Sequence, residues 1–158
     1  MDTISRLNWN ETYSVSLDLL DAEHRKFFNV INQLISAHER EATDYLPTIS
    51  KLIHYSYFTF HQEHLAMMIA NYPGFARHIR EHQKFTAKME EFLKDYVIGR
   101  PDLGEKMIIF LKSWVREHII PLDVQFGYYL RRNPQMHEQI QKAHTTMHPS
   151  HQLHVVNA

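Results

Sequence analysis

The chain has 158 residues, no cysteine, 13 histidines and a formal net charge of −1 when the histidines are neutral. This length is sufficient for one domain with a buried core, and the even charge balance predicts neither a nucleic-acid nor a membrane partner. The absence of cysteine excludes disulfides and thiolate metal ligands. No apolar run approaches the roughly 20 residues of a membrane span. The first residues also lack the pattern of a secretion signal, so we expect a soluble, cytoplasmic protein.

The N-terminal residues 1–17 form an aromatic arm with little helical patterning, in which Trp9 and Tyr13 are four residues apart. We expect this arm to pack across the ends of the helices. From Asp18 onward apolar residues recur at helical spacing. This spacing predicts a first helix that ends in the charged stretch 38–41.

A second helix is expected from Asp44 to Ala70, with Pro47 in its first turn, where a missing N–H costs little. It stops before the breaker sequence Asn71-Tyr72-Pro73-Gly74. A third helix is expected from Phe75 to Val97, and a fourth from Leu103 to Arg132. Long helices with short connections and no strand candidate predict an all-α fold, an antiparallel up-down-up-down four-helix bundle.

The bundle with its arm is expected to occupy residues 1–133, followed by a histidine-rich tail over residues 134–158. The tail has few large apolar residues, which predicts a short helix over 135–144 and then disorder. We expect its histidines to be solvated. They are His137, His144, His148, His151 and His154.

His78 and His82 are four residues apart, a spacing that places both imidazoles on one face of a helix. Further donors fall on the other expected helices. They are His24 on the first, Glu63 on the second, and His118 and Asp123 on the fourth. Imidazoles and carboxylates without cysteine suit iron, manganese or zinc better than copper(I) or an iron–sulfur cluster.

Both carboxylates have apolar sequence neighbours, and a buried carboxylate is costly unless it is paired or bound to metal. Two carboxylates and several imidazoles exceed what one ion needs, and they fit two ions that both carboxylates bridge. A single histidine is more often a surface or hydrogen-bonded core residue than a ligand. We assign that ordinary role to His38, His54, His61 and His64.

Between Trp9 and about Tyr129, the chain resembles the hemerythrin family, specifically its bacterial single-domain type (bacteriohemerythrin). The residues that carry the resemblance are Trp9…Tyr13, Asp21-Ala-Glu-His24, Phe60-x2-Glu63-x3-Met67, Tyr72-Pro73-x4-His78-x3-His82 and Trp114-x3-His118-Ile119-x3-Asp123.

This resemblance implies a pair of non-haem iron ions, oxo- or hydroxo-bridged, that bind O2 reversibly at one iron. It implies that His78, His82 and His118 hold the first iron and that His24 holds the second. By the same resemblance Glu63 and Asp123 bridge the two ions, and Ile119 helps to shield bound O2.

The sequence departs from the family at one ligand. The family has His-Phe-x-x-Glu on its second helix, and this chain has Thr59-Phe60-His61-Gln62-Glu63. Thr59 therefore stands where a histidine ligand of the second iron is expected, which opens a coordination position to water or an anion.

None of the nearby side chains is a good replacement for that histidine. At about 100° per residue, His61 is roughly 160° around the helix from Thr59, and His54 and His64 are roughly 140° away. Gln62 and Tyr55 lie on the same face as Thr59, but they are weak ligands beside an imidazole.

Three functions are consistent with this sequence. The first is an O2-binding protein that serves as carrier, store or sensor and is not an enzyme. The second is a di-iron redox enzyme with weak peroxidase- or oxidase-type activity, in which the open position lets peroxide or nitric oxide react. The third is a degenerate site that holds a single or structural metal. A separate protein partner is compatible with each.

His118 and Asp123 are five residues apart, which separates them by about 140° on a regular α-helix. Pro121 lies between them and lacks the N–H that would bond the carbonyl of Glu117. We therefore predict a kink or one wide turn at residues 117–121 that brings both side chains to the metals.

Overall fold

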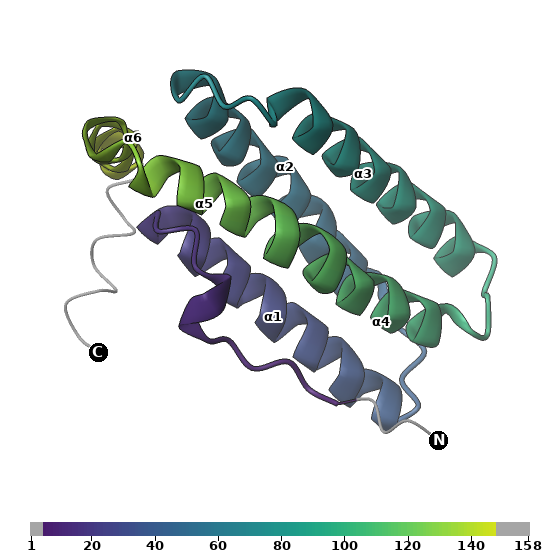
Figure 1. Cartoon of the computed structure of the whole chain (residues 1–158). Coiled ribbons are helices and arrows are strands. Elements are labelled where there is room, and N and C mark those ends of the chain that lie inside the picture. Colours follow the sequence, from purple (N-terminus) through teal and green to yellow (C-terminus); the bar gives the residue numbers. More distant parts are fainter. Residues whose placement is uncertain (1–4, 148–158) are drawn as a thin grey trace.

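The structure, a computed structural model, describes residues 5–147 (Figure 1). Over this range the chain forms no β-strand, as predicted, and α1, α2, α3 and the continuous segment made of α4 and α5 lie side by side as a helical bundle. The helices are α1 (Asp18–Glu39), α2 (Leu46–Ile69), α3 (Phe75–Val97), α4 (Leu103–Trp114), α5 (Val124–Arg131) and α6 (Pro134–Met147). A short 3₁₀ helix, η1 (Glu11–Tyr13), precedes them, and a π-helical segment, η2 (Val115–Asp123), joins α4 to α5.

Local sequence signals set the ends of the helices. The bounds of α3 are those predicted, whereas α2 begins at Leu46 rather than Asp44. The Asp44 carboxylate lies before the helix and accepts a hydrogen bond from the Leu46 N–H at 3.1 Å. Gly99 follows α3 with a φ of 69°, a left-handed conformation that glycine adopts without strain.

The fourth predicted helix is not a uniform α-helix. Between α4 and α5 the chain winds more widely, and the Val124 N–H donates to the carbonyl of Ile119, five residues before it. Pro121 lies inside this segment. The predicted wide turn is thus confirmed, and it extends over residues 115–123 rather than 117–121.

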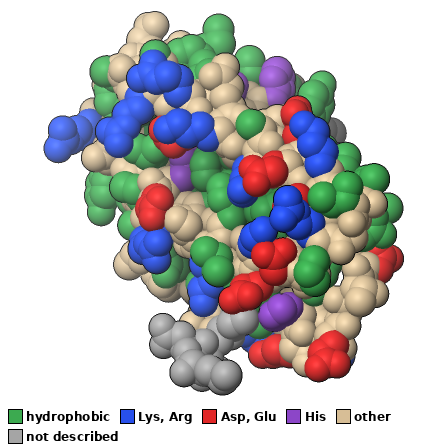
Figure 2. Space-filling view, turned by 90° about the vertical axis from the view of Figure 1, so that its right-hand side faces the viewer, with side chains coloured by type: hydrophobic (Ala, Val, Ile, Leu, Met, Phe, Trp, Pro, Cys, Tyr) green, Lys and Arg blue, Asp and Glu red, His purple; other side chains and the backbone are tan. Residues whose placement is uncertain are grey.

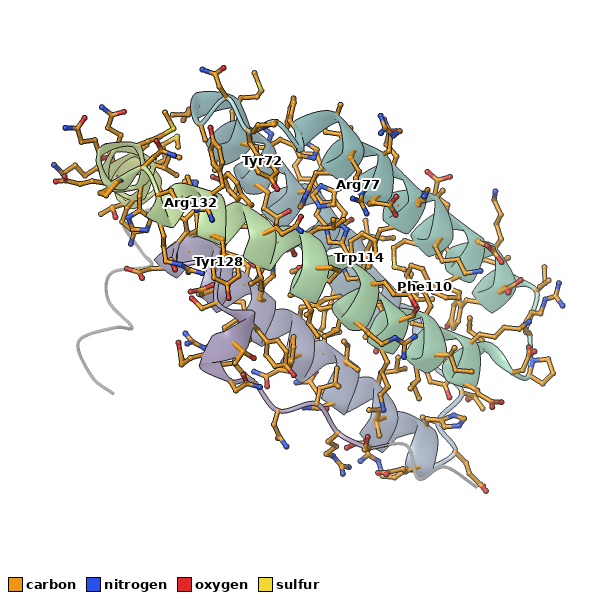
Figure 3. The ribbon with its side chains drawn as sticks, viewed as in Figure 1. Tyr72, Arg77, Phe110, Trp114, Tyr128 and Arg132 are labelled. Atoms are coloured by element: carbon orange, nitrogen blue, oxygen red, sulfur yellow. The ribbon has the colours of Figure 1, made fainter. Side chains whose placement is uncertain are left out.

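The apolar core consists of two clusters that a polar layer separates along the bundle. On α2, for example, the larger cluster ends at Phe60 and the smaller one begins at Ala66, with Glu63 between them. The larger cluster includes Phe27, Ile31, Phe85, Phe92, Leu111 and Trp114, and the smaller one includes Leu17, Leu20, Met67, Phe126 and Leu130. Figure 3 shows Phe110 and Trp114 on α4, on the side of the larger cluster, and Tyr72 near the connection of α2 to α3.

The N-terminal arm does not pack across the ends of the bundle, contrary to our expectation. It runs along α1: the Arg6 guanidinium donates to the Ser36 hydroxyl at 2.7 Å, and the Leu7 N–H donates to the Asn32 side chain at 2.8 Å. The ring of Trp9 packs against α1, with its centroid 5.6 Å from that of the Phe28 ring. The arm therefore has its hydrogen-bonding and packing partners along the length of α1 rather than at the end of the bundle.

The end of the arm is fixed at the start of α1 by Asp21. Its carboxylate accepts the Val15 N–H at 2.8 Å and the Ser14 hydroxyl at 2.6 Å. The arm crosses α5 at Gly127, where a Cβ atom would lie 2.8 Å from the Val15 Cα. A larger residue at position 127 would push the arm away from the bundle.

The region after residue 133 is more ordered than we predicted. Helix α6 extends to Met147, and its Ile140 is buried in the smaller apolar cluster. His144 is buried rather than solvated, and His137 is half-buried with its ring against the backbone carbonyl of Ser16. The expectation failed because α6 packs on α5, α1 and α2. His148, His151 and His154 lie outside the described residues.

Over residues 5–147, no helix has the combination of length and apolar character that a membrane span requires. Figure 2 shows one face of the molecule, on which basic and acidic side chains both occur together with hydrophobic ones. This mixture agrees with the near-zero net charge of the sequence.

Candidate metal centre

The six predicted metal ligands all lie in the polar layer between the two apolar clusters. Each is buried, with at most 3 % of its surface exposed. They come from four helical segments of the bundle. His24 lies on α1, Glu63 on α2, His78 and His82 on α3, and His118 and Asp123 on η2. Sequence spacing therefore identified a set of side chains that the fold brings together.

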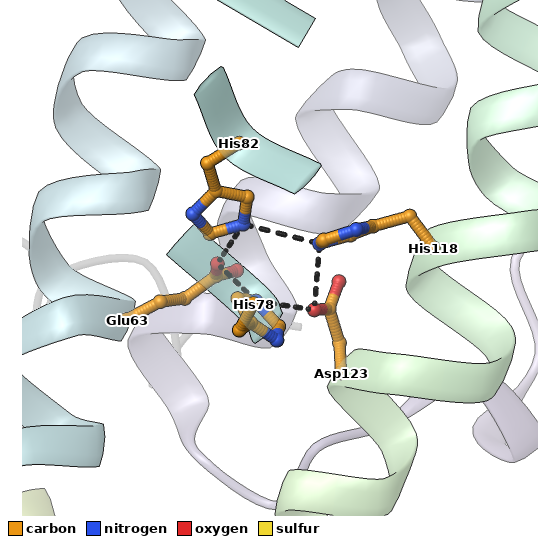
Figure 4. Close-up of side chains that lie close together, drawn as sticks. All are labelled: Glu63, His78, His82, His118 and Asp123. Atoms are coloured by element: carbon orange, nitrogen blue, oxygen red, sulfur yellow. Dashed lines mark hydrogen bonds and ion pairs between the residues drawn. The ribbon is translucent and has the colours of Figure 1, made fainter. Parts of the chain in front are cut away.

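Five of these side chains form one compact cluster, drawn in Figure 4. Each offers one ligand atom, and these atoms lie within 4.8 Å of one another. The Nε2 atoms of His82 and His118 are 3.1 Å apart. Such close approach of imidazole nitrogens with carboxylate oxygens around a buried point is the arrangement of a metal site.

The two carboxylates each present one oxygen to this cluster. Glu63 Oε2 lies 3.0 Å from His82 Nε2 and 3.4 Å from His78 Nε2. Asp123 Oδ1 lies 3.1 Å from His78 Nε2 and 3.2 Å from His118 Nε2. We call the point among these three imidazoles and two oxygens the first position.

The other oxygen of each carboxylate faces His24. The His24 Nε2 lies 3.3 Å from Glu63 Oε1 and 3.4 Å from Asp123 Oδ2. We call this point, beside His24 and the outer carboxylate oxygens, the second position. Each carboxylate therefore directs one oxygen toward each position.

The titration of these groups reflects their burial and mutual contact. Burial disfavours the charged form of His24 and His78, but hydrogen bonds and charges of Asp123 and Glu63 outweigh it and raise the pKa of His24 to about 10 and that of His78 to about 9. Burial is the largest influence on His82 and lowers its pKa to about 4. Without metal, His24 and His78 are thus protonated, and their positive charge takes the place of the charge that a metal ion would supply.

The carboxylates shift in the opposite direction. Burial and the charge of Asp123 oppose ionisation of Glu63, but hydrogen bonds from His24, His78 and His82 hold the pKa of Glu63 well below its usual range. Burial likewise opposes ionisation of Asp123, and the charge and hydrogen bond of His118 outweigh it, so the pKa of Asp123 is also well below its usual range. Both carboxylates are therefore anionic and ready to bind a cation.

The π-helical segment explains how His118 and Asp123 reach the same point. On a regular α-helix a separation of five residues would turn the two side chains about 140° apart. The wider winding of η2 brings Asp123 Oδ1 to 3.2 Å from His118 Nε2. π-Helical turns of this kind occur frequently at functional sites.

Aromatic rings hold two of the ligand imidazoles in place on the side of the first position. The ring of Phe60 stacks on His82 with centroids 3.6 Å apart and planes within 5°. The ring of Trp114 stacks on His118 with centroids 3.9 Å apart and planes within 12°. Stacking on both imidazoles restricts their rotation and prepares the first position for metal.

Thr59, the residue that replaces a histidine of the family pattern, is fully buried, and its hydroxyl has no hydrogen-bond partner within residues 5–147. Gln62, one turn further along α2, is also buried, and its Oε1 has no partner in that same part of the chain. His54 and His61 are exposed, so neither turns into the core to replace the missing ligand.

The histidines to which we assigned no metal lie at the surface or in hydrogen bonds, as predicted, and one of them contacts a predicted metal ligand. His38 lies near the Tyr45 hydroxyl at 3.5 Å. His64 Nε2 lies 2.8 Å from His82 Nδ1, so His64 supports a predicted metal ligand. No sequence signal identified this contact, because the two residues come from different helices and are 18 positions apart.

The side chains in the polar layer fit a metal site better than a hydrogen-bonded core. The Thr59 hydroxyl is buried without a hydrogen-bond partner within the described range. A core that evolved only for packing rarely leaves such atoms unpaired. The fold and its polar layer together define a helical bundle with a buried candidate metal site of imidazoles and carboxylates.

Comparison with known proteins leads to the same class. The sequence model of a family described as the hemerythrin HHE cation binding domain matches residues 15–119. Because this match covers more than half of the 158 residues, the chain belongs to the hemerythrin family, as the sequence resemblance predicted.

Individual relatives support this assignment. The bacteriohemerythrin of Clostridium acetobutylicum is 26% identical over 124 residues, which is 75% of this chain and 96% of that protein. The bacteriohemerythrin of Stenotrophomonas maltophilia is 28% identical over 118 residues, 72% of this chain and 74% of that protein. The myohemerythrin of Riftia pachyptila is 25% identical over 118 residues, 75% of this chain and 88% of that protein.

Proposed function

We propose that this protein binds O2 reversibly at a non-haem di-iron centre. The observation that carries the proposal is the orientation of the two carboxylates. Glu63 and Asp123 each place one oxygen beside the three-imidazole cluster and the other beside His24. A single metal ion would leave half of these oxygens unused.

Each position would hold one iron ion. His78, His82 and His118 would bind the first iron, His24 would bind the second, and Glu63 and Asp123 would bridge them. Bound iron would supply reversible electron transfer to O2, which side chains alone cannot do. Ile119, which is fully buried beside His118, would keep water from the bound gas.

Thr59 would leave the second iron with fewer protein ligands than the family pattern provides. Its buried hydroxyl without a partner supports a small polar ligand, such as water, hydroxide or an anion, at this point. The second iron would then be the more weakly held of the two.

The same feature supports a second function, a redox enzyme that acts on peroxide or nitric oxide. Catalytic metals keep coordination positions open to exchangeable ligands. Thr59 provides one such position in addition to the position that O2 would occupy. On this alternative the centre turns over its ligand rather than releasing it unchanged.

The remaining parts of the proposal rest on the sequence. The short connections between successive long helices favour the antiparallel up-down-up-down order. A role as carrier, store or sensor of O2, and a cytoplasmic location, stay predictions from the sequence.

Metal analysis joined to a visible spectrum tests the proposal. The purified protein is expected to contain close to two irons per chain and to change its spectrum reversibly when air is admitted and removed. A folded protein that never retains more than one metal ion would contradict the di-iron centre and favour the degenerate site. Irreversible oxidation with consumption of added peroxide would favour the enzyme.

A further inference from the structure

His64 is a half-buried side chain that contacts the metal centre from its outer side. It lies on α2 directly after Glu63, and it is half-buried. Its Nε2 atom is 2.8 Å from Nδ1 of His82, a predicted ligand on α3. The two ring planes are within 24° and the ring centroids are 5.0 Å apart, as expected for two imidazoles joined edge to edge through their nitrogens.

The direction of this hydrogen bond follows from the opposite edge of the His82 ring. The Nε2 atom of His82 faces the first position, 3.0 Å from Glu63 Oε2 and 3.1 Å from His118 Nε2. A nitrogen that binds metal offers its lone pair, so the single N–H of neutral His82 must be on Nδ1. His82 therefore donates to His64 Nε2, and the proton of neutral His64 lies on its own Nδ1.

Two of the other predicted ligands, His24 and His118, lack such a partner in the described part of the chain. The Nδ1 atoms of His24 and His118 are buried without a hydrogen bond to any of residues 5–147. Phe60 stacks on the face of the His82 ring with centroids 3.6 Å apart and limits its tilt, but face stacking does not distinguish the two ring orientations that a half-turn about the Cβ–Cγ bond exchanges. The hydrogen bond to His64 selects one of these orientations.

We propose that His64 is a positioning residue of the metal centre, which fixes the tautomer and orientation of His82 and makes its imidazole a stronger ligand. This inference rests on the proposed metal function. An acceptor on the outer nitrogen of a ligand histidine increases the electron density that the inner nitrogen gives to the metal. His64 thereby favours occupancy of the first position and stabilises oxidised over reduced iron.

Replacement of His64 separates this role from packing. The variant His64→Leu removes the acceptor, whereas His64→Gln keeps an oxygen that can accept from His82 Nδ1. His61→Leu is the matched control, because His61 is exposed on the same helix and is one turn away. Zinc(II) binding is measured by competition with a chelator, and folding is verified by the helical circular dichroism signal.

Zinc affinity at the first position is expected to fall roughly 10- to 100-fold in His64→Leu, the usual cost of losing a supporting hydrogen bond to a ligand. His64→Gln is expected to stay close to the parent, and His61→Leu to match it. Iron-loaded His64→Leu is expected to have a higher reduction potential than the parent. Equal zinc affinity and equal potential in His64→Leu and the parent would overturn the inference.

A measurement on the unaltered chain does not depend on how the variants fold. In ¹⁵N-labelled zinc protein, the His82 Nδ1–H is expected to show a scalar coupling across the hydrogen bond to His64 Nε2. Zinc binding without this coupling would overturn the role of His64 and leave the metal centre intact. A parent chain that binds no metal would instead overturn the proposed function, and this inference with it.

Discussion

The two candidate metal positions share both carboxylates and differ in nearly everything else. Around the first position are the imidazoles of His78, His82 and His118, two of which stack on aromatic rings. Around the second position His24 is the single imidazole among the predicted ligands, and by the family pattern Thr59 stands where another imidazole is expected.

This difference shows how one layer of a bundle can combine a rigid site with an open one. The first position is surrounded by side chains that packing and hydrogen bonds hold in one orientation, so little freedom is lost when metal binds. The second position would lack one imidazole of the family pattern, and the Thr59 hydroxyl is buried without a partner in the described chain. It is the place where an external ligand can bind at the lowest cost.

The largest effect is expected at the first position. The variant His118→Ala removes one of its imidazoles and the hydrogen-bonding partner of Asp123. Loss of a supporting hydrogen bond alone costs up to roughly 100-fold in metal affinity, so loss of a ligand is expected to cost more than that. Titration with zinc measures the change, and His54→Ala, at an exposed position, is the control. Unchanged affinity in His118→Ala would show that the compact cluster is not the tighter site.

Thr59→His is expected to reduce the difference between the two positions. A second imidazole beside His24 would tighten the second metal, by roughly 10- to 100-fold if the ring enters without strain, and would lengthen the life of the oxygenated protein. Retention of iron during exposure to a chelator and the rate of autoxidation measure both effects.

Thr59→Val is the matched control for that variant, because it has the same shape but neither hydroxyl nor imidazole. It is expected to hold the second metal no better than the parent. Equal iron retention and equal lifetime in Thr59→His and the parent would show that position 59 does not face the second metal.

The metal-free protein is expected to lose stability as the pH rises above 7. The pKa of His24 is about 10 and that of His78 about 9 in the folded chain, against 6.5 as the ordinary value. Stability from these raised pKa values is fully present below pH 6.5 and is lost as the pH rises through 9 and 10. Thermal unfolding followed by circular dichroism measures the change.

Metal-loaded protein is the control for this pH dependence. Bound metal replaces the protons of His24 and His78, so its thermal midpoint is expected to change less between pH 7 and pH 10. His24 has the higher pKa, and therefore the second position is expected to lose metal first when the pH is lowered. A midpoint of the metal-free protein that does not change from pH 7 to pH 10 would contradict this account.

The smallest expected effect is a difference in the fluorescence quenching of the two tryptophans of the chain as metal is added. Trp114 stacks on His118, and the ring of Trp9 lies 6.4 Å from that of His24. In Trp9→Phe the fluorescence of Trp114 is expected to be quenched when metal fills the first position. In Trp114→Phe the fluorescence of Trp9 is expected to be quenched at a higher metal concentration. Quenching of both at the same concentration would show that the positions fill together.

Much of this molecule could be predicted from periodic patterns and spacing. The breaker before Phe75 and the glycine after Val97 fixed α3 at both ends, because turn residues act locally. The six predicted ligands lie together because the helices present these side chains at one level of the bundle. Even the wide turn followed from arithmetic, since His118 and Asp123 cannot share a face of a regular helix.

The features that sequence analysis missed depend on contacts between distant segments. The path of the arm is set by partners such as Asn32 and Gly127, which carry no signal of their own. Burial of His144 depends on the packing of α6 over the bundle end. The contact of His64 with His82 also requires two helices in a particular register, and no local pattern contains that information.

The π-helical segment means that the rod from Leu103 to Arg131 contains more residues than its turns require as a plain α-helix. Deletion of Pro121 would remove one residue and restore a continuous set of N–H donors. His118 and the present Asp123 would then be four positions apart, the spacing that a regular helix presents on one face. A deletion at Lys112 in α4 has no wide turn to absorb it. Such a deletion would rotate the residues before position 112 by about 100° relative to those after it. The α4 part of this segment therefore tolerates no change in length, whereas the π-helical part η2 does.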